Sequence, residues 1–233
     1  MDLNRHRFYM YNVLRDIYSN PQLRFLLGFK GGTALMFFYN LPRFSVDLDF
    51  NLLQKDKEEF VFQEVRNILL KYGKIEDEAI KFFGQLLVLN YGSGERNLKI
   101  EISNRQYPNH YEQKNLLGIN MQVMTMPDMF AHKLCALLER VETANRDIFD
   151  CWFFLNNRTP INRELLELRV QIPLEDYMGK CIDMLETMPE SSLLNGLGEL
   201  IDAQTKTFVR LNLRKDVISL LRFYQAFPIC EKI

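Results

Sequence analysis

Long apolar runs, closely spaced cysteines and a strong charge of either sign are all missing from this chain of 233 residues. No apolar run is long enough to cross a bilayer, and the polar start at residues 2–7 does not resemble a signal peptide. We therefore expect a cytoplasmic protein with no membrane segment. The formal net charge is −1, so any nucleic-acid surface has to be a local patch of basic residues.

Metal-ligand patterns of cysteine and histidine are also missing. The three histidines do not complete a cluster, and the four cysteines lack the close spacing of a zinc site. We interpret the cysteines as structural thiols in a reducing compartment. They are Cys135, Cys151, Cys181 and Cys230.

An ordinary globular composition is what remains, with 47% hydrophobic and 25% charged residues. Apolar periodicity and turn residues predict an α+β fold, which is a small mixed β-sheet core with flanking helices plus a C-terminal helical bundle. The predicted helices cover residues 2–19, 33–39, 56–72, 127–139, 143–155, 163–170, 175–186, 190–203 and 206–224. The predicted strands cover residues 23–29, 45–52, 75–82, 84–91, 97–103 and 116–124, and residues 104–115 are predicted to be a loop.

The stretch at residues 30–50 has the clearest chemical pattern. Gly31, Gly32 and Thr33 form a turn at the start of a short helix, where backbone N–H groups and the helix dipole favour an anion. Asp47 and Asp49 follow in an apolar strand, on one face and about 7 Å apart. A phosphate-binding turn followed by paired acids suggests Mg²⁺-dependent chemistry on a nucleotide.

The same residues resemble a known family. Gly-Gly-Thr-Ala-Leu at 31–35 and Arg-Phe-Ser-Val-Asp-Leu-Asp-Phe at 43–50 look like the signature of the AbiEii/AbiGii toxins, which are DNA polymerase β-like nucleotidyltransferases. An Asp-x-Asp pair also opens the haloacid dehalogenase motif. That family has an apolar run before the first Asp and a small Gly-Thr/Val sequence after the second, and residues 43–45 and 50–51 do not match this.

The resemblance implies a catalytic metal site of three acids. Asp47, Asp49 and a carboxylate on a neighbouring strand would hold two Mg²⁺ ions, and Glu101 fits the third position. Family members often have Asp there, so the Glu departs from the pattern. The alternative is that Glu101 belongs to the solvent-facing alternation of an edge strand.

The resemblance also implies a nucleotide-binding set made of Gly31, Gly32, Thr33, Ser45 and Lys133. Lys133 lies in a predicted helix, and a lysine there can reach triphosphate oxygens as a point charge. Arg140 is seven residues further on and shares its face.

The following Arg-Asp-x-x-Asp motif at residues 146–150 resembles a later family motif. It makes Asp147 the candidate catalytic base or acceptor-positioning group. The alternative is a network of salt bridges between the two helices.

The predicted function is nucleotide transfer from an NTP to an RNA acceptor, plausibly tRNA, by a toxin with a cognate antitoxin as a partner. The nucleotidyltransferase-like domain covers residues 1–125, and the helical domain at residues 126–233 is expected to close the active-site cleft. A small-molecule (antibiotic-type) nucleotidyltransferase and a non-catalytic nucleotide- or RNA-binding module are the alternatives. Lys206, Arg210 and Arg214 form a basic helix face that could contact nucleic acid or an antitoxin, or could be a solvated surface.

Overall fold

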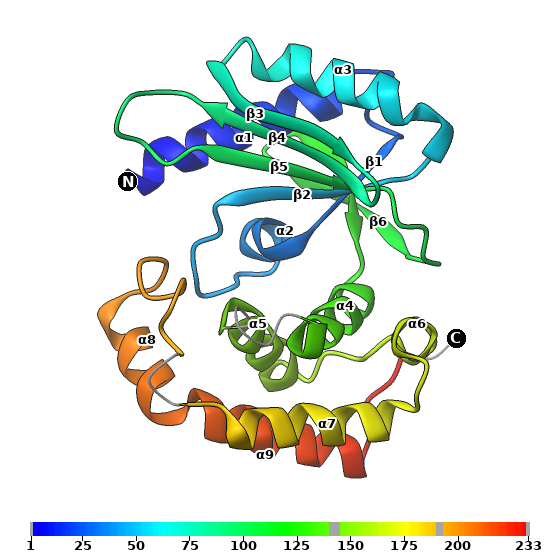
Figure 1. Ribbon diagram of the computed structural model, residues 1–233, viewed down its shortest axis with the longest axis vertical. Coiled ribbons are helices and arrows are strands. Elements are labelled where there is room, and N and C mark those ends of the chain that lie inside the picture. The colour runs from blue at the N-terminus through cyan, green and yellow to red at the C-terminus, as the bar shows by residue number, and fades with distance from the viewer. Residues whose placement is uncertain (1, 140–144, 190–192, 232–233) are drawn as a thin grey trace. The chain divides into compact units, whose positions relative to one another are not determined.

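The computed structural model describes residues 2–139, 145–189 and 193–231, which divide into two compact units (Figure 1). The first unit contains residues 1–40 and 45–124, and the second contains residues 41–44 and 125–233. The chain therefore enters the second unit at Leu41 and returns to the first at Ser45 before it continues.

A seven-stranded mixed sheet forms the first unit, with strand order β3-β4-β5-β2-β1-β7-β6. The strands are β1 (Leu27–Lys30), β2 (Asp47–Leu52), β3 (Lys74–Lys81), β4 (Gly84–Asn90), β5 (Leu98–Ser103), β6 (Tyr111–Leu116) and β7 (Ile119–Met124). Strand β2 is central, with β1 antiparallel on one side and β5 parallel on the other.

Helices cover both faces of this sheet. Helix α1 (Leu3–Ser19) and helix α3 (Glu58–Leu69), which follows the short η1 (Lys55–Lys57), lie on one face, and α2 (Gly31–Phe38) lies on the other (Figure 1). Helix α3 forms because its apolar residues recur as one stripe while glutamates occupy its first turn. The core between α1, α3 and the sheet is fully buried at Leu14, Val65 and Ile100.

The second unit is helical. Its elements are α4 (Met126–Glu139), α5 (Asn145–Asn156), α6 (Arg163–Val170), α7 (Leu174–Thr187), α8 (Ala203–Phe208), the π-helical segment η4 (Val209–Leu213) and α9 (Arg214–Ala226). Phe130 stacks on Phe154 with ring centroids 4.9 Å apart, and Tyr224 meets Phe130 edge to face. These rings join α4, α5 and α9 into one core.

The predicted α+β class is confirmed, and most predicted elements agree with the structure within a few residues. Helix α6 has the predicted bounds of 163–170. The strand predicted at residues 23–29 begins only at Leu27. The preceding residues form a turn in which Asn20 O accepts hydrogen bonds from the N–H groups of Leu23 and Arg24.

Two predictions for local structure are wrong, and a third is modified. Residues 111–116, predicted to be mostly loop, form the edge strand β6, which pairs with β7. Its polar sequence lacks the apolar alternation that would predict a strand. The turn at Leu117 and Gly118, both with positive φ, shortens the strand predicted at 116–124. The helix predicted at 206–224 is present as one helical run, from α8 through the π-helical turn η4 to α9, since Phe208, Val209 and Arg214 have right-handed helical conformations.

The helix predicted at residues 190–203 is also wrong where the structure describes it, because 193–200 form successive turns. Gly196 has a φ of 68°, which a continuous helix does not allow. Residues 190–192 lie outside the described part of the chain, as do the first two residues of the helix predicted at 143–155.

Candidate functional site

Three carboxylates lie on one face of the central strands. Asp47 and Asp49 alternate with buried residues along β2, and the parallel register pairs Asp49 with Glu101 of β5. Side chains of paired residues on adjacent strands leave the sheet on the same side. The register therefore keeps Glu101 beside the Asp pair, and its catalytic role stays a prediction.

Lys99 belongs to the same cluster, because it pairs with Asp47 in the register and forms a salt bridge with Glu101. Partial burial would lower the pKa of Lys99, but the hydrogen bond to Glu101 and the charges of Glu101, Asp47 and Asp49 outweigh burial and raise it. The lysine is therefore held by the negative potential of all three acids. Carboxylate oxygens are the donors that Mg²⁺ prefers. Binding of a divalent cation by Asp47, Asp49 and Glu101 stays a prediction.

Two side chains fix the backbone on either side of Asp47. The Thr33 hydroxyl, from α2, donates to the carbonyl oxygen of Asp47 itself. His6 Nε2, from α1, donates to the carbonyl oxygen of Val46 over 2.8 Å, and the Tyr91 hydroxyl donates to His6 Nδ1 over 2.6 Å. The carbonyl can only accept, so the proton lies on Nε2.

Burial lowers the pKa of His6, although its bond to Val46 opposes the shift. The imidazole is fully buried and acts through its hydrogen bonds as a positioning group for the start of β2. This role of His6 could not be predicted from the sequence. A single histidine in an amphipathic helix gives no signal of a contact 40 residues away.

The start of helix α2 lies against Asp49. Gly31 has a φ of 79°, and a Cβ atom at this position would overlap the Asp49 carboxylate. The residue at the N-cap position, Lys30, makes no side-chain hydrogen bond to the first turn of this helix, which begins with Gly31, Gly32 and Thr33. The turn therefore has the geometry to accept an anion next to the acids.

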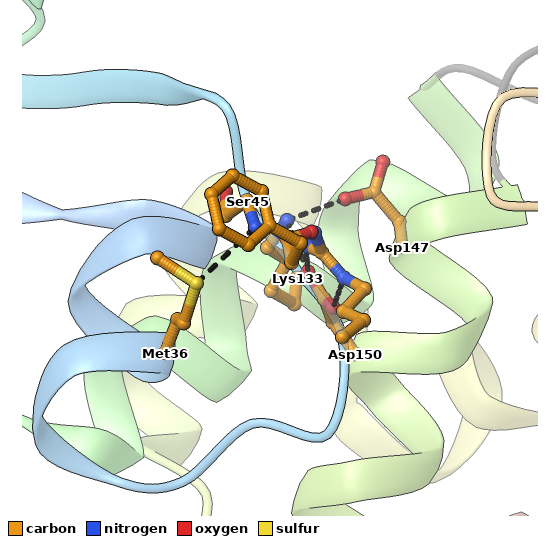
Figure 2. A network of polar contacts seen from close by, with 7 residues as sticks. Met36, Ser45, Lys133, Asp147 and Asp150 are labelled. Carbon is orange, nitrogen blue, oxygen red and sulfur yellow. Dashed lines mark hydrogen bonds and ion pairs between the residues drawn. The ribbon is translucent and has the colours of Figure 1, made fainter. Parts of the chain in front are cut away.

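Ser45 is buried just before β2, and its backbone N–H donates to Met36 Sδ over 3.4 Å (Figure 2). This contact fixes the entry into β2 from the side of α2. The role of Ser45 in nucleotide binding stays a prediction.

A buried ionic network occupies the second unit. Arg43 donates two hydrogen bonds to Asp150, with Nε–Oδ1 2.6 Å and Nη2–Oδ2 2.7 Å. Lys133 Nζ lies 2.7 Å from Asp147 Oδ1 and 2.8 Å from Asp150 Oδ2 (Figure 2). The alternative offered by the sequence, salt bridges between the helices of Lys133 and Asp147, is therefore present.

Charge compensation in this network overcomes burial. Burial would raise the pKa of Asp150, but Arg43 and Lys133 hold it below its ordinary value. Burial would likewise lower the pKa of Lys133, but Asp147 and Asp150 raise it instead. Lys133 is thus a permanent cation held by two carboxylates. Its binding of phosphate and the catalytic role of Asp147 stay predictions, and Arg140 lies outside the described residues.

The basic face predicted near the C-terminus is divided among three elements. Lys206 lies in α8, Arg210 is exposed in η4, and Arg214 begins α9. Arg214 donates to the Met188 carbonyl oxygen over 2.7 Å, so part of this face has a structural role. Contact with nucleic acid stays a prediction.

The sheet, with its acid cluster beside a glycine turn, defines a fold of the nucleotidyltransferase type. The chain is 20% identical to a protein of H. pylori described as a candidate nucleotidyltransferase, with a TM-score of 0.59 and coverage of 95% of this chain and 94% of that one. It is also 20% identical to JHP933 of Helicobacter pylori, with a TM-score of 0.56 and coverage of 96% and 95%. At this identity the likeness establishes the fold.

The family follows from the sequence itself. Residues 12–206 match the model of the nucleotidyl transferase AbiEii toxins of type IV toxin–antitoxin systems, and the chain belongs to this family. The resemblance seen in the motifs is thereby confirmed. No curated protein matches the sequence. Among the described residues, no helix is both long and apolar enough to span a bilayer.

Proposed function

We propose that this protein is a Mg²⁺-dependent nucleotidyltransferase that transfers a nucleotide from an NTP to an RNA acceptor such as a tRNA. The observation that supports this most is the register that joins Asp47 and Asp49 of β2 to Glu101 of β5. Three carboxylates on one face, next to a glycine turn at a helix N-terminus, are the ligand types that suit a metal-bound triphosphate.

The reaction exchanges one phosphorus–oxygen bond for another. A hydroxyl oxygen of the acceptor attacks the α-phosphorus of the NTP, the bond from that phosphorus to the β-bridging oxygen breaks, and pyrophosphate leaves. The hydroxyl proton passes to a base, for which Asp147 is the candidate. Two Mg²⁺ ions, when bound by Asp47, Asp49 and Glu101, would supply charge neutralisation at the phosphates and activation of the hydroxyl.

The chain's own residues prepare this site. Thr33 and His6 hold the backbone at Asp47, so the carboxylate is placed before any substrate arrives. The N–H groups of the Gly31 turn offer hydrogen bonds to phosphate oxygens. Lys99 balances part of the negative charge of the acids, which lowers the cost of clustering them.

The identity of the acceptor can be tested by measuring which molecule becomes labelled. The purified protein is incubated with each of the four α-labelled NTPs, with Mg²⁺, and with total bacterial RNA or an aminoglycoside as acceptor. We expect label in RNA, only with Mg²⁺, and with a preference for one NTP. Label in the aminoglycoside alone would identify a small-molecule transferase, and no label in either would indicate a non-catalytic module.

We further propose that the activity is toxic and is countered by a cognate antitoxin, as the family description implies. Expression in bacteria should slow growth, and Asp49→Asn should relieve the effect because the amide loses the charge that binds Mg²⁺. Equal growth inhibition by both forms, at equal soluble levels, would point to a non-catalytic effect.

A further inference from the structure

The turn between β3 and β4 exposes two aromatic rings. Phe82 is 87% exposed and Phe83 is 54% exposed, and their rings meet edge to face with centroids 4.7 Å apart. Exposed apolar side chains that adjoin one another can form a patch that marks an interaction site.

One cationic side chain lies over these rings, and a second cationic residue adjoins them in the sequence. The Arg105 guanidinium lies over the Phe83 ring, 4.4 Å from its centroid, and Lys81 immediately precedes the pair. Neither cation forms a salt bridge within the described part of the chain. By contrast, Lys74 at the other end of β3 pairs with Glu76. The turn therefore carries two cations that form no ion pair with a carboxylate of the described residues.

Hydrogen bonds hold the turn in place. The Asn104 N–H donates to the Phe83 carbonyl oxygen over 3.2 Å, and its side-chain amide donates to the Phe82 carbonyl oxygen over 3.2 Å. The same amide donates to Glu58 Oε1 over 2.8 Å, which ties the turn to the start of α3. A prearranged aromatic pair loses little conformational entropy when a ligand stacks on it.

The turn is close to the acid cluster along the sheet. In the pairing of β4 with β5, Gly84 lies opposite Ser103 and Leu86 lies opposite Glu101. Phe83 precedes Gly84, so it lies three residue positions along the strands from Glu101. At the usual rise per residue, Phe83 is about 10 Å from Glu101 along the strands. A short single-stranded segment can span this distance.

We propose that Phe82 and Phe83, with Arg105 and Lys81, form a stacking contact for unpaired bases of the RNA acceptor. Every base has a flat π-face that stacks on exposed aromatic rings, and neighbouring cations bind the phosphates. The inference rests on the proposed function in taking RNA as the acceptor. A second copy of this chain is the poorer occupant, because a two-fold contact would bring these cations of both copies together.

The test measures binding of a labelled single-stranded oligouridine to the full-length protein, without NTP. Phe82→Ala and Phe82→Leu should each weaken binding about tenfold, whereas Phe82→Trp should retain it, because stacking requires an aromatic ring. Arg105→Ala should reduce the slope of log affinity against log salt by about one. The matched control is Phe8→Ala, since Phe8 is 60% exposed in α1 and should not affect binding.

Two outcomes would overturn the inference. Phe82→Leu could bind oligouridine as tightly as the wild type, or Phe82→Ala could abolish self-association in sedimentation while leaving RNA affinity unchanged. The proposed function can fail independently of this inference. If RNA binding depends on Phe82 but no nucleotide is transferred to any acceptor, the transferase activity is refuted and the stacking role of Phe82 is supported. If nucleotide transfer to RNA and RNA binding are both unchanged by substitution of Phe82, the transferase activity is supported and the stacking role is refuted.

Discussion

The ionic network of the second unit makes a sharp prediction about Asp150. This side chain is fully buried and accepts hydrogen bonds from Arg43 and Lys133. Asp150→Asn keeps the shape of the side chain but removes its charge. Lys133 retains Asp147, whereas Arg43, whose side chain is 3% exposed, loses its bidentate partner.

The magnitude follows from the buried charge that is left behind. Removing one partner of a buried ion pair costs about 3–5 kcal/mol, because the other charge keeps its desolvation penalty without its compensation. Domains are stable by only about 5–15 kcal/mol, so this is a large fraction of the total. An exposed pair is the control: Glu186 and Arg222 are 2.5 Å apart but largely exposed, and Glu186→Ala should cost less than about 1 kcal/mol.

The chain offers a local reporter for the assay. Its single tryptophan, Trp152, lies in α5 two residues after Asp150 and packs on Phe149 and Phe208. Urea denaturation followed by tryptophan fluorescence therefore reports on the second unit. A loss of less than about 1 kcal/mol in Asp150→Asn would refute the view that this network stabilises the unit.

The same network predicts a dependence on pH. Because the pKa of Asp150 is depressed in the folded state, its contribution is fully present above its unfolded value of about 3.9 and is lost as pH falls through the folded value. The urea midpoint of the wild type should therefore fall in acid. Asp150→Asn should lack this component of the acid dependence.

Three further sets of substitutions test the site and the surfaces around it. Gly31→Ala should reduce nucleotide transfer about a hundredfold, measured as initial rate, because the new methyl group would displace the carboxylate of Asp49. His6→Ala should destabilise the protein by about 2–4 kcal/mol in urea denaturation, and His6→Gln should recover part of this by donating to the same carbonyl. The double substitution Arg210→Glu and Arg214→Glu should weaken RNA labelling and reduce its dependence on salt concentration, while NTP affinity stays unchanged. Unchanged RNA labelling would mean that this face is an ordinary solvated surface.

Much of the fold could be predicted because its apolar patterns are strong. The stripe of α3 and the alternation of β4 and β5 each identify one element with its buried face. The failures have physical causes. Strand β6 is polar because it is an edge strand, and the turns at residues 193–200 depend on the conformation of Gly196 rather than on apolar spacing.

The candidate site was predictable only in its motif residues. Asp47, Asp49 and the glycine turn are close in sequence, and Glu101 follows from the alternation of β5. Lys99 required the register of β5 against β2, which no local pattern encodes. The attachment of Arg43 to Asp150 joins residues 107 positions apart, so only the folded chain shows it.

The most direct test of the central claim is the rate of label transfer from an α-labelled NTP to RNA in matched proteins. Wild type, Asp49→Asn and the exposed-acid control Asp77→Asn are compared with Mg²⁺ and with excess EDTA. We expect transfer by the wild type and by Asp77→Asn with Mg²⁺, and none by Asp49→Asn or in EDTA. Transfer by Asp49→Asn at the wild-type rate, or transfer that persists in EDTA, would contradict the assignment of the acid cluster as the metal-dependent catalytic site.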